Sequence, residues 1–334
     1  MNLQFRDTLA DKVKEAAKTN VFIGTSSWKY PGWCGQIYDE QKYLTRGKFS
    51  EAKFERECLS EYAETFSTVC VDAGYYQFPT EKGLEKLCQQ VPPHFRFSFK
   101  VTDFITLKHF PNQPRHGIHA GKPNENFLNA ALFRSAFLKP CESFREQIGV
   151  LIFEFSQFYP SDFERGRDFV NALDAFLCEL PAGWQYAVEI RNRTFLQPEY
   201  FEVLHKHGIA HVFNSWARMP AVNEQLEIPE SVTTDFIAAR FLLTPGRSYA
   251  KAVESFSPYK EVKEPSDKVR AAGRNVITKG KEGKRPSFIY VTTAWRVMRQ
   301  RLLQLYWNKP VLLNVPKPTD YHRFPMPYAL FLVF

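Results

Sequence analysis

Long apolar runs, paired cysteines and a glycine-rich nucleotide loop are all missing from this 334-residue sequence. No run approaches the roughly 18 consecutive apolar residues that a membrane-spanning helix needs, and residues 1–20 lack the apolar stretch of a secretion signal. The six cysteines are scattered without a Cys-x-x-Cys pair, which indicates reduced thiols and not a disulfide framework or a zinc site. We therefore expect a cytoplasmic protein with no membrane partner.

Eight short runs rich in apolar and β-branched residues recur along the chain, separated by segments with helical periodicity. Strands alternating with helices predict a parallel sheet, and eight is the strand number of a TIM-type (β/α)8 barrel in the α/β class. No Gly-x-Gly-x-x-Gly follows the first run to favour a dinucleotide fold instead. The expected strands are Val21–Thr25, Thr68–Asp72, Phe95–Val101, Gly149–Phe155, Tyr186–Arg191, Ile209–Asn214, Phe236–Phe241 and Phe288–Val291.

Capping residues and apolar stripes mark the helices between these strands. Ser161 precedes a stripe that includes Phe169, Leu173 and Phe176, which predicts a helix starting there. Two Pro-rich segments, 220–230 and 243–265, lack clean helical periodicity and are expected loops. The expected helix starts are Ser50, Thr80, Asn124, Ser161 and Pro198.

Polar residues at the carboxyl ends of the strands are the candidates for chemistry, because barrel active sites form at that end. Alternation in residues 97–102 puts Ser98, Lys100 and Thr102 on one face, and Glu189 shares a face with Arg191. The opposite faces are bulky and apolar, so the polar faces should point into the barrel. Three carboxylates then meet three cations in one mouth.

This grouping predicts acid–base chemistry, although an ion-pair network that binds nothing is the alternative. We assign proton transfer to Lys100 and Glu189, with Asp72 and Glu154 as supporting catalytic carboxylates. Lysine in such a site acts as acid, base or Schiff-base nucleophile. The candidate substrate-binding residues are Arg191, Arg240, Arg247, Tyr249, Trp28, Tyr30 and Asn214.

Several of these candidates have an equally ordinary structural explanation. Trp28 and Tyr30 either stack on a ligand ring or belong to a packed loop, and the turn containing Arg247 is an anion clamp or a solvated turn. His205, His207 and His211 cluster near the sixth strand, where surface histidines are a better explanation than a metal site. We assign no metal ligands and no particular cofactor.

The strand-end segments resemble one family, domain of unknown function 72, the YecE-like proteins. The resemblance covers residues 20–291 and implies a TIM-type barrel, but it supplies no activity. Its motifs are Ile23-Gly-Thr-Ser-Ser-Trp-Lys-Tyr-Pro-Gly-Trp33, Val69-Cys-Val-Asp-Ala-Gly-Tyr-Tyr-Gln-Phe-Pro79, Phe95-Arg-Phe-Ser-Phe-Lys-Val101, Gly149-Val-Leu-Ile-Phe-Glu-Phe155, Val188-Glu-Ile-Arg191 and Arg240-Phe-Leu-Leu-Thr-Pro-Gly-Arg-Ser-Tyr249.

The resemblance ends after the eighth strand, where family members typically read Asn-Asn-Arg-x-Glu-Gly-Asn-Ala-Pro before an apolar helix. Here the strand is followed by Thr-Thr-Ala-Trp-Arg-Val-Met-Arg-Gln (292–300). Suitable codons can be chosen for this segment such that, with one nucleotide added in front, the shifted reading frame encodes Asn-Asn-Arg-Leu-Glu-Gly-Asn-Ala-Pro. Trp295 and Met298 have a single codon each, so the match is constrained.

We infer that residues 292–334 are an aberrant, out-of-frame tail, arising from a mutation or a sequencing error. A divergent natural C-terminus is the alternative. The expected organisation is a helical extension (1–20), a barrel domain (21–291) whose eighth unit is disrupted, and this tail. Resequencing the 3′ end of the gene tests the inference, because an open frame with no family motif in the neighbouring frame would contradict it.

The tail also holds most of the excess positive charge. The whole chain carries a formal charge of +8, but without residues 292–334 there are 38 basic and 35 acidic residues, a charge of +3. Basicity therefore gives little support to a nucleic-acid partner.

Three functions follow from these patterns. The first is an enzyme of the hydrolase, isomerase or lyase type, acting on a small polar or anionic metabolite at the barrel mouth. The second is a non-catalytic metabolite-binding protein, and the third is a nucleic-acid-binding or nuclease-like barrel. The expected partner is a small molecule, and the oligomeric state stays open.

Overall fold

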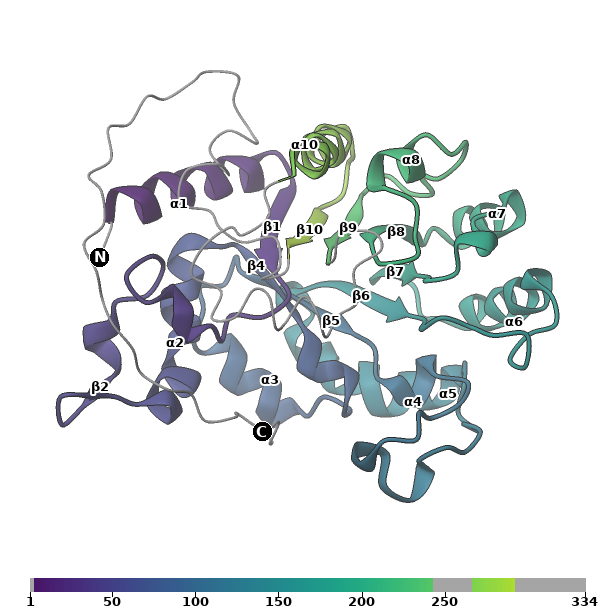
Figure 1. The fold of residues 1–334 in the computed structure, drawn as a ribbon, viewed down its shortest axis with the longest axis horizontal. Coiled ribbons are helices and arrows are strands. Elements are labelled where there is room, and N and C mark those ends of the chain that lie inside the picture. Colours follow the sequence, from purple (N-terminus) through teal and green to yellow (C-terminus); the bar gives the residue numbers. More distant parts are fainter. Residues whose placement is uncertain (1–2, 243–265, 292–334) are drawn as a thin grey trace.

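Eight parallel strands close into a barrel in the computed structural model, which describes residues 3–242 and 266–291 (Figure 1). The order around the barrel is β1-β10-β9-β8-β7-β6-β5-β4, and a two-stranded β2-β3 hairpin (Leu44–Thr45, Lys48–Phe49) lies outside it. The predicted TIM-type barrel is confirmed. The barrel strands are β1 (Val21–Thr25), β4 (Thr68–Val71), β5 (Arg96–Lys100), β6 (Ile148–Glu154), β7 (Gln185–Glu189), β8 (Ala210–Ser215), β9 (Ala238–Phe241) and β10 (Ser287–Val291).

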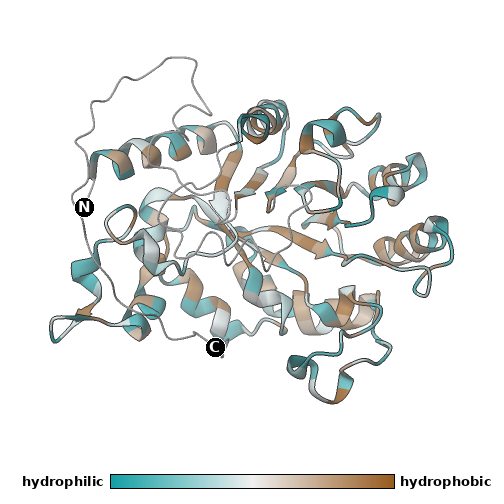
Figure 2. Ribbon diagram, in the orientation of Figure 1, coloured by the Kyte–Doolittle hydropathy of each residue, from teal (hydrophilic) through white to brown (hydrophobic). Residues whose placement is uncertain are grey.

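Helices surround the strands and turn their apolar sides toward them (Figures 1 and 2). The α-helices are α1 (Leu3–Lys18), α2 (Glu51–Thr65), α3 (Glu81–Cys88), α4 (Asp103–Thr106), α5 (Ala130–Leu132), α6 (Gly166–Cys178), α7 (Pro198–His207), α8 (Val222–Leu226) and α10 (Asp267–Lys281). The other helical segments are the 3-10 helices η1 (Pro31–Trp33), η2 (Glu40–Tyr43), η3 (Asp72–Tyr75), η4 (Pro114–His119), η6 (Lys139–Gln147) and η7 (Arg193–Phe195), and the π-helix η5 (Phe133–Leu138).

All eight expected strands are present, each with ends within two residues of the prediction. The eighth, β10, pairs with both β1 and β9 and so completes the ring. The strand of the eighth unit is therefore in place, while residues 292–334 lie outside the described residues. The expected loop at 243–265 also lies outside them.

Three of the expected helix starts are confirmed by their caps. Ser50 accepts a hydrogen bond from the backbone N–H of Lys53, and Thr80 accepts one from Gly83. Pro198 is the first residue of α7, where its missing N–H costs nothing.

The other two helix starts are wrong. The helix expected from Ser161 begins at Gly166, because the N–H of Arg165 is capped by the Asp168 carboxylate at 3.1 Å. Asn124 begins no helix, since its amide donates to the carbonyls of Phe104 and Leu107 at 2.9 and 2.7 Å and so ties down a loop.

The expected loop at 220–230 contains a short helix, α8. Its first turn is stabilised because the Glu224 carboxylate accepts from the N–H of Ala221 at 3.3 Å. Periodicity could not reveal it, because five helical residues span little more than one turn.

Two positions in the barrel wall have room for glycine alone. A Cβ at Gly24 would lie 2.0 Å from the carbonyl oxygen of Thr68 on the neighbouring strand. A Cβ at Gly149 would lie 2.6 Å from Ser98 Oγ and 2.7 Å from the ring of Phe288, inside the barrel. Strand packing therefore admits no side chain at either position.

His211 corrects the expectation of a solvated histidine cluster. Its ring is fully buried on the outer face of β8, 3.1 Å from the hydroxyl of Tyr200, and burial lowers its pKa to about 4. His207, by contrast, pairs with Asp174 between α7 and α6 at 2.5 Å.

Burial of neutral His211 predicts a loss of stability in mild acid. The unfolded chain takes up a proton as the pH falls below about 6.5, whereas the folded protein does not until about pH 4. The free energy of unfolding should therefore fall by about 3 kcal/mol across this interval on account of His211. Urea unfolding of the wild type and of His211→Phe at pH 7 and pH 4.5 measures it, with exposed His205→Ala as the control. An equally steep loss in His211→Phe would contradict the assignment.

Candidate functional site

The six charged candidates at the strand ends come together at the carboxyl end of the barrel. The period-two alternation holds, because Phe97, Phe99 and Val188 face the helices while Lys100 and Glu189 point into the barrel. The charged side chains come from β4, β5, β6, β7 and β9 or from the residues that follow these strands. They are Asp72, Lys100, Glu154, Glu189, Arg191 and Arg240.

Glu154 is the carboxylate that all three cations share. Its Oε2 atom lies 2.9 Å from Lys100 Nζ and 2.6 Å from Arg240 Nη1, and its Oε1 atom lies 2.8 Å from Arg191 Nη2. Burial favours the neutral carboxyl, but the charges of Arg191, Lys100 and Arg240 outweigh it and hold the pKa of Glu154 well below its ordinary value. Glu154 is therefore a permanent anion at neutral pH.

Arg240 reaches across the barrel to the other two carboxylates. Its Nη1 atom is 2.6 Å from Glu189 Oε2, and its Nη2 atom is 3.3 Å from Asp72 Oδ1. Glu189 also pairs with Arg191 Nη2 at 3.3 Å. Arg240 thus binds carboxylates from three different strand ends and fixes their relative positions.

Only part of this cluster is open to solvent. The Asp72 side chain is 42 % exposed, and those of Lys100 and Arg191 are 11 % and 12 % exposed. Glu154, Glu189 and Arg240 are buried, at 4 % exposure or less. A ligand entering the mouth would therefore meet Asp72, Lys100 and Arg191 first.

The same arrangement sets the protonation state of Lys100. Burial opposes its ammonium form, but Glu154 and Asp72, whose Oδ1 lies 4.0 Å from Nζ, outweigh it and raise the pKa of Lys100. The amine is consequently protonated at neutral pH, which disfavours a Schiff-base role for the free protein.

Two aromatic residues of the site were not identified from the sequence. Lys100 Nζ lies 4.1 Å from the centre of the Tyr75 ring, and Arg191 Cζ lies 3.7 Å from that of Trp216. Trp216 continues the inward face of β8 two residues beyond Asn214, so alternation offered a signal for it. Both rings restrict the cations through cation–π contacts.

The remaining candidates take no part in the ion pairs or lie outside the described residues. Trp28 is buried in the hydrophobic core, and its carbonyl accepts from the hydroxyl of Tyr38. Tyr30 packs beside Trp33, with ring centres 4.8 Å apart, which favours the packed-loop explanation for this segment. Arg247 and Tyr249 lie outside the described residues. Asn214 lies next to Arg240 in register and donates to the carbonyl of Ile190 at 3.1 Å.

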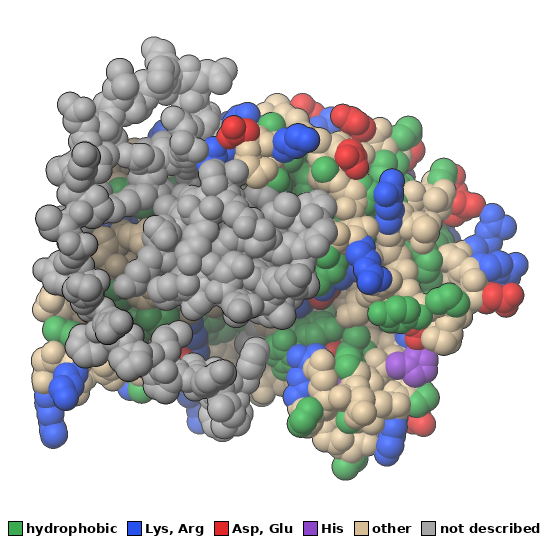
Figure 3. All heavy atoms as spheres, viewed as in Figure 1, with side chains coloured by type: hydrophobic (Ala, Val, Ile, Leu, Met, Phe, Trp, Pro, Cys, Tyr) green, Lys and Arg blue, Asp and Glu red, His purple; other side chains and the backbone are tan. Residues whose placement is uncertain are grey.

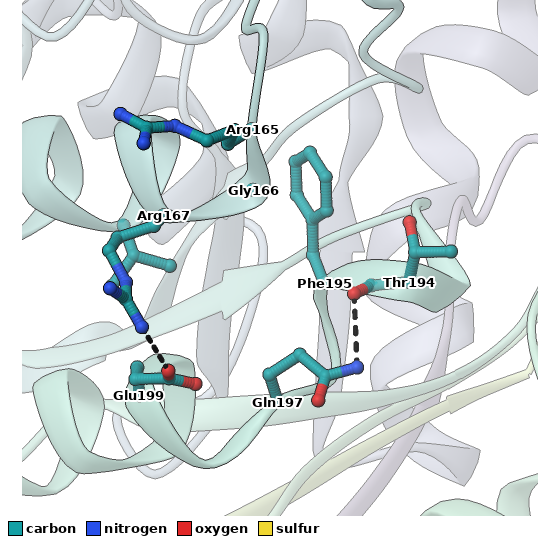
Figure 4. A pocket seen from close by; sticks show the side chains of 8 residues that line it. Arg165, Gly166, Arg167, Thr194, Phe195, Gln197 and Glu199 are labelled. Carbon is teal, nitrogen blue, oxygen red and sulfur yellow. Dashed lines mark hydrogen bonds and ion pairs between the residues drawn. The ribbon is translucent and has the colours of Figure 1, made fainter.

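A cavity of about 360 Å³ lies elsewhere, between the start of α6 and the η7–α7 segment (Figure 4). It is separate from the charged cluster, and its cations are already paired. Arg167 binds Glu199 at 2.9 Å and Arg165 binds Asp168 at 3.0 Å. Unlike the pairs of the mouth, these pairs are exposed and screened by water, so their electrostatic effect on a ligand is weaker.

Residues 3–242 and 266–291 contain neither a metal-ligand cluster nor a membrane-spanning helix. Within these ranges, no three His, Cys, Asp or Glu side chains are placed to hold a metal ion, and no helix is long and apolar enough to cross a membrane. On the described part of the face in Figure 3, cationic and anionic side chains are interspersed. A field of one sign, the usual mark of a nucleic-acid surface, is not visible there.

Fold and site together define a closed α/β barrel with an ion-paired, partly open mouth. A family model described as "Protein of unknown function DUF72" matches residues 22–296, so the chain belongs to this family. The resemblance stated from the sequence motifs is thereby confirmed. No curated protein matches the chain.

Solved structures of the family have the same fold. A DUF72 family protein from Thermotoga maritima matches with a TM-score of 0.55 at 17 % identity, covering 85 % of this chain and 96 % of its own. One from Enterococcus faecalis matches with a TM-score of 0.54 at 17 % identity, covering 88 % and 100 %. At this identity the likeness supports the barrel alone.

Proposed function

We propose that the chain is an enzyme that performs acid–base chemistry on a small polar or anionic metabolite at the carboxyl end of its barrel. The observation that carries the proposal is the balanced group of three carboxylates and three cations, of which Asp72, Lys100 and Arg191 reach solvent. Barrel enzymes bind their substrates at this mouth. Ion pairs that only stabilise the fold could be buried anywhere in the protein, so their position at the mouth supports a role in chemistry. Hydrolysis, isomerisation and lyase cleavage are the reaction types that such groups can catalyse.

The exposures suggest a division of roles among the charged residues. We assign proton donation to Lys100, which is protonated and accessible, and proton acceptance to Asp72, whose carboxylate faces it at 4.0 Å. Arg191, whose Cζ lies 3.7 Å from the centre of the Trp216 ring, is suited to anchor an anionic substrate group. The sequence pattern favoured Glu189 for proton transfer, but its full burial suits a positioning role.

Glu154 and Arg240 complete the scheme as positioning residues. Each binds partners from several strand ends, and neither is open to solvent. Arg240 was expected to bind substrate. Its Nη atoms are already taken by Glu189, Glu154 and Asp72, so only its Nε–H is left to contact a ligand. Pre-organisation of this kind keeps reacting groups in place without reorganisation during the reaction.

A non-catalytic binding protein is the second candidate. The observation in its favour is that each of the three carboxylates already has a cationic partner, so none is a free base. Turnover of a bound metabolite separates the two candidates.

Screening pools of polar metabolites by thermal shift tests the proposal. A ligand that binds only the folded protein raises its melting temperature, and each hit is then incubated with the protein and examined for product. We expect a hit to be converted, and expect Arg191→Met to lose the thermal shift. The matched control is Arg167→Met, in an exposed ion pair away from the mouth. Hits that bind equally well to Arg191→Met would contradict the proposed site.

A further inference from the structure

Three polar residues follow one another along the wall at the mouth of the barrel: Arg191, two residues beyond the end of β7, Asn214 on β8 and Arg240 on β9. The β8–β9 pairing places Asn214 beside Arg240. The β7–β8 pairing is recorded up to Val188 and His211, and beyond it Asn214 Nδ2 donates to the carbonyl of Ile190, the residue before Arg191, at 3.1 Å. The backbones of these three residues are therefore neighbours, and we call Arg191, Asn214 and Arg240 the row.

Each residue of this row has one buried polar atom without a hydrogen-bond partner. These atoms are Arg191 Nε, Asn214 Oδ1 and Arg240 Nε. Asn214 is fully buried and Arg240 is 2 % exposed. The orientation of the Asn214 amide is fixed by its Nδ2, which donates to the carbonyls of Ile190 and Val212 at 3.1 and 3.3 Å.

Such atoms are uncommon in a folded protein, because a buried polar group without a partner is destabilising. Among the described residues the others are Ser26 Oγ, Thr65 Oγ1, His211 Nε2 and Ser231 Oγ. Three of the seven thus fall in one row, which shares Arg191 and Arg240 with the ion-paired cluster of the mouth. The row offers two N–H donors and one carbonyl acceptor.

We propose that this row binds hydroxyl groups of the substrate, which makes the substrate a hydroxyl-bearing compound such as a polyol or a hydroxy acid. A hydroxyl oxygen accepts from the Nε–H groups, and its proton is donated to Asn214 Oδ1. A carboxylate or a fully ionised phosphate has no proton for Asn214, and an ammonium group has no lone pair for either arginine. The proposal rests on the function proposed above and specifies its substrate class.

Two three-carbon acids that differ in their hydroxyl groups provide the test. Glycerate carries two hydroxyls and propionate none, while glycerol has hydroxyls without the carboxylate. The readout is the pair of Nε–H signals of Arg191 and Arg240 in nitrogen–proton NMR spectra, assigned by Arg191→Lys and Arg240→Lys. We expect glycerate and glycerol to shift both signals and propionate to shift neither.

Two results would overturn the proposal. One is that none of the three compounds moves the signals, which would mean that water alone fills the row. The other is that propionate moves them as far as glycerate does. Asn214→Val, which lacks the acceptor, should lose the preference for glycerate over propionate, and an unchanged preference would also count against the proposal. If this variant does not fold, the wild-type titration decides alone.

This experiment fails or succeeds separately from the proposed function. It measures contact at two N–H groups and requires no turnover. If turnover depends on Lys100 but no compound shifts the Nε–H signals, the proposed substrate class is wrong while the proposed enzymatic activity stands. Hydroxyl binding without turnover of any hit would favour the binding protein.

Discussion

Replacing Arg240 with methionine is expected to destabilise the protein by about 3–5 kcal/mol at neutral pH, the range for removing one partner of a buried ion pair. Arg240 Nη1 lies 2.6 Å from both Glu154 and Glu189, and Glu189 is completely buried. Methionine fills much of the same volume but carries no charge. Glu189 would keep Arg191, at 3.3 Å, as its remaining cationic partner.

Urea unfolding at pH 7 measures this effect, and a second substitution identifies its cause. If uncompensated charge is responsible, Glu189→Gln should restore part of the stability in the Arg240→Met background. Arg167→Met, which breaks an exposed pair with Glu199, is the matched control and should change stability by less than about 1 kcal/mol. Equal stabilities of Arg240→Met and Arg167→Met would contradict the buried network described here.

Replacing Lys100 with alanine is expected to lower turnover by about 10²- to 10⁴-fold, the usual range for loss of one general acid or base. The barrel should remain folded, because Glu154 keeps Arg191 and Arg240 as partners at 2.8 and 2.6 Å. Turnover of a metabolite identified in the screen is compared with that of the wild type, and circular dichroism establishes that the variant is folded. Lys206→Ala, from an exposed pair with Asp174, controls for loss of a lysine. Undiminished turnover by a folded Lys100→Ala protein would exclude this lysine from the reaction.

Much of this site could be predicted from the sequence because two simple rules act together. Alternation along a strand separates Lys100 from Phe99 and Val101, and closure of eight parallel strands points every inward strand end at one mouth. The bulky residues between the charges identified the outer face. Grouping Asp72, Lys100 and Arg240 therefore required no knowledge of their distances.

Exposure within the mouth could not be predicted in this way. It depends on how far a long side chain reaches across the barrel, as Arg240 does from β9 to Glu154 on β6. Glu189 and Asp72 look alike in the sequence, yet one is fully buried and the other is 42 % exposed. Alternation gives the direction of a side chain and leaves open which partners cover it.

The failures among the helix starts have a local origin. Ser161 and Asn124 are residue types that cap helices, but the same side chains also stabilise turns and loops. Asn124 donates its amide to the carbonyls of Phe104 and Leu107 at the end of α4. The residue before the first turn of α6 is Arg165 and not Ser161, because the Asp168 carboxylate accepts from the N–H of Arg165. His211 was misjudged because the burial of one face of β8 depends on α7, which packs against it.

Following one bound metabolite over time shows directly whether the mouth of the barrel converts a ligand or only binds it. A hit from the thermal-shift screen is incubated with the wild type and with Lys100→Ala, and its proton NMR spectrum is recorded at intervals. We expect new product signals with the wild type and a rate at least about 100-fold lower with the variant. A ligand that stays bound to the wild-type protein with an unchanged spectrum throughout an extended incubation would contradict conversion at the mouth and establish a binding protein instead.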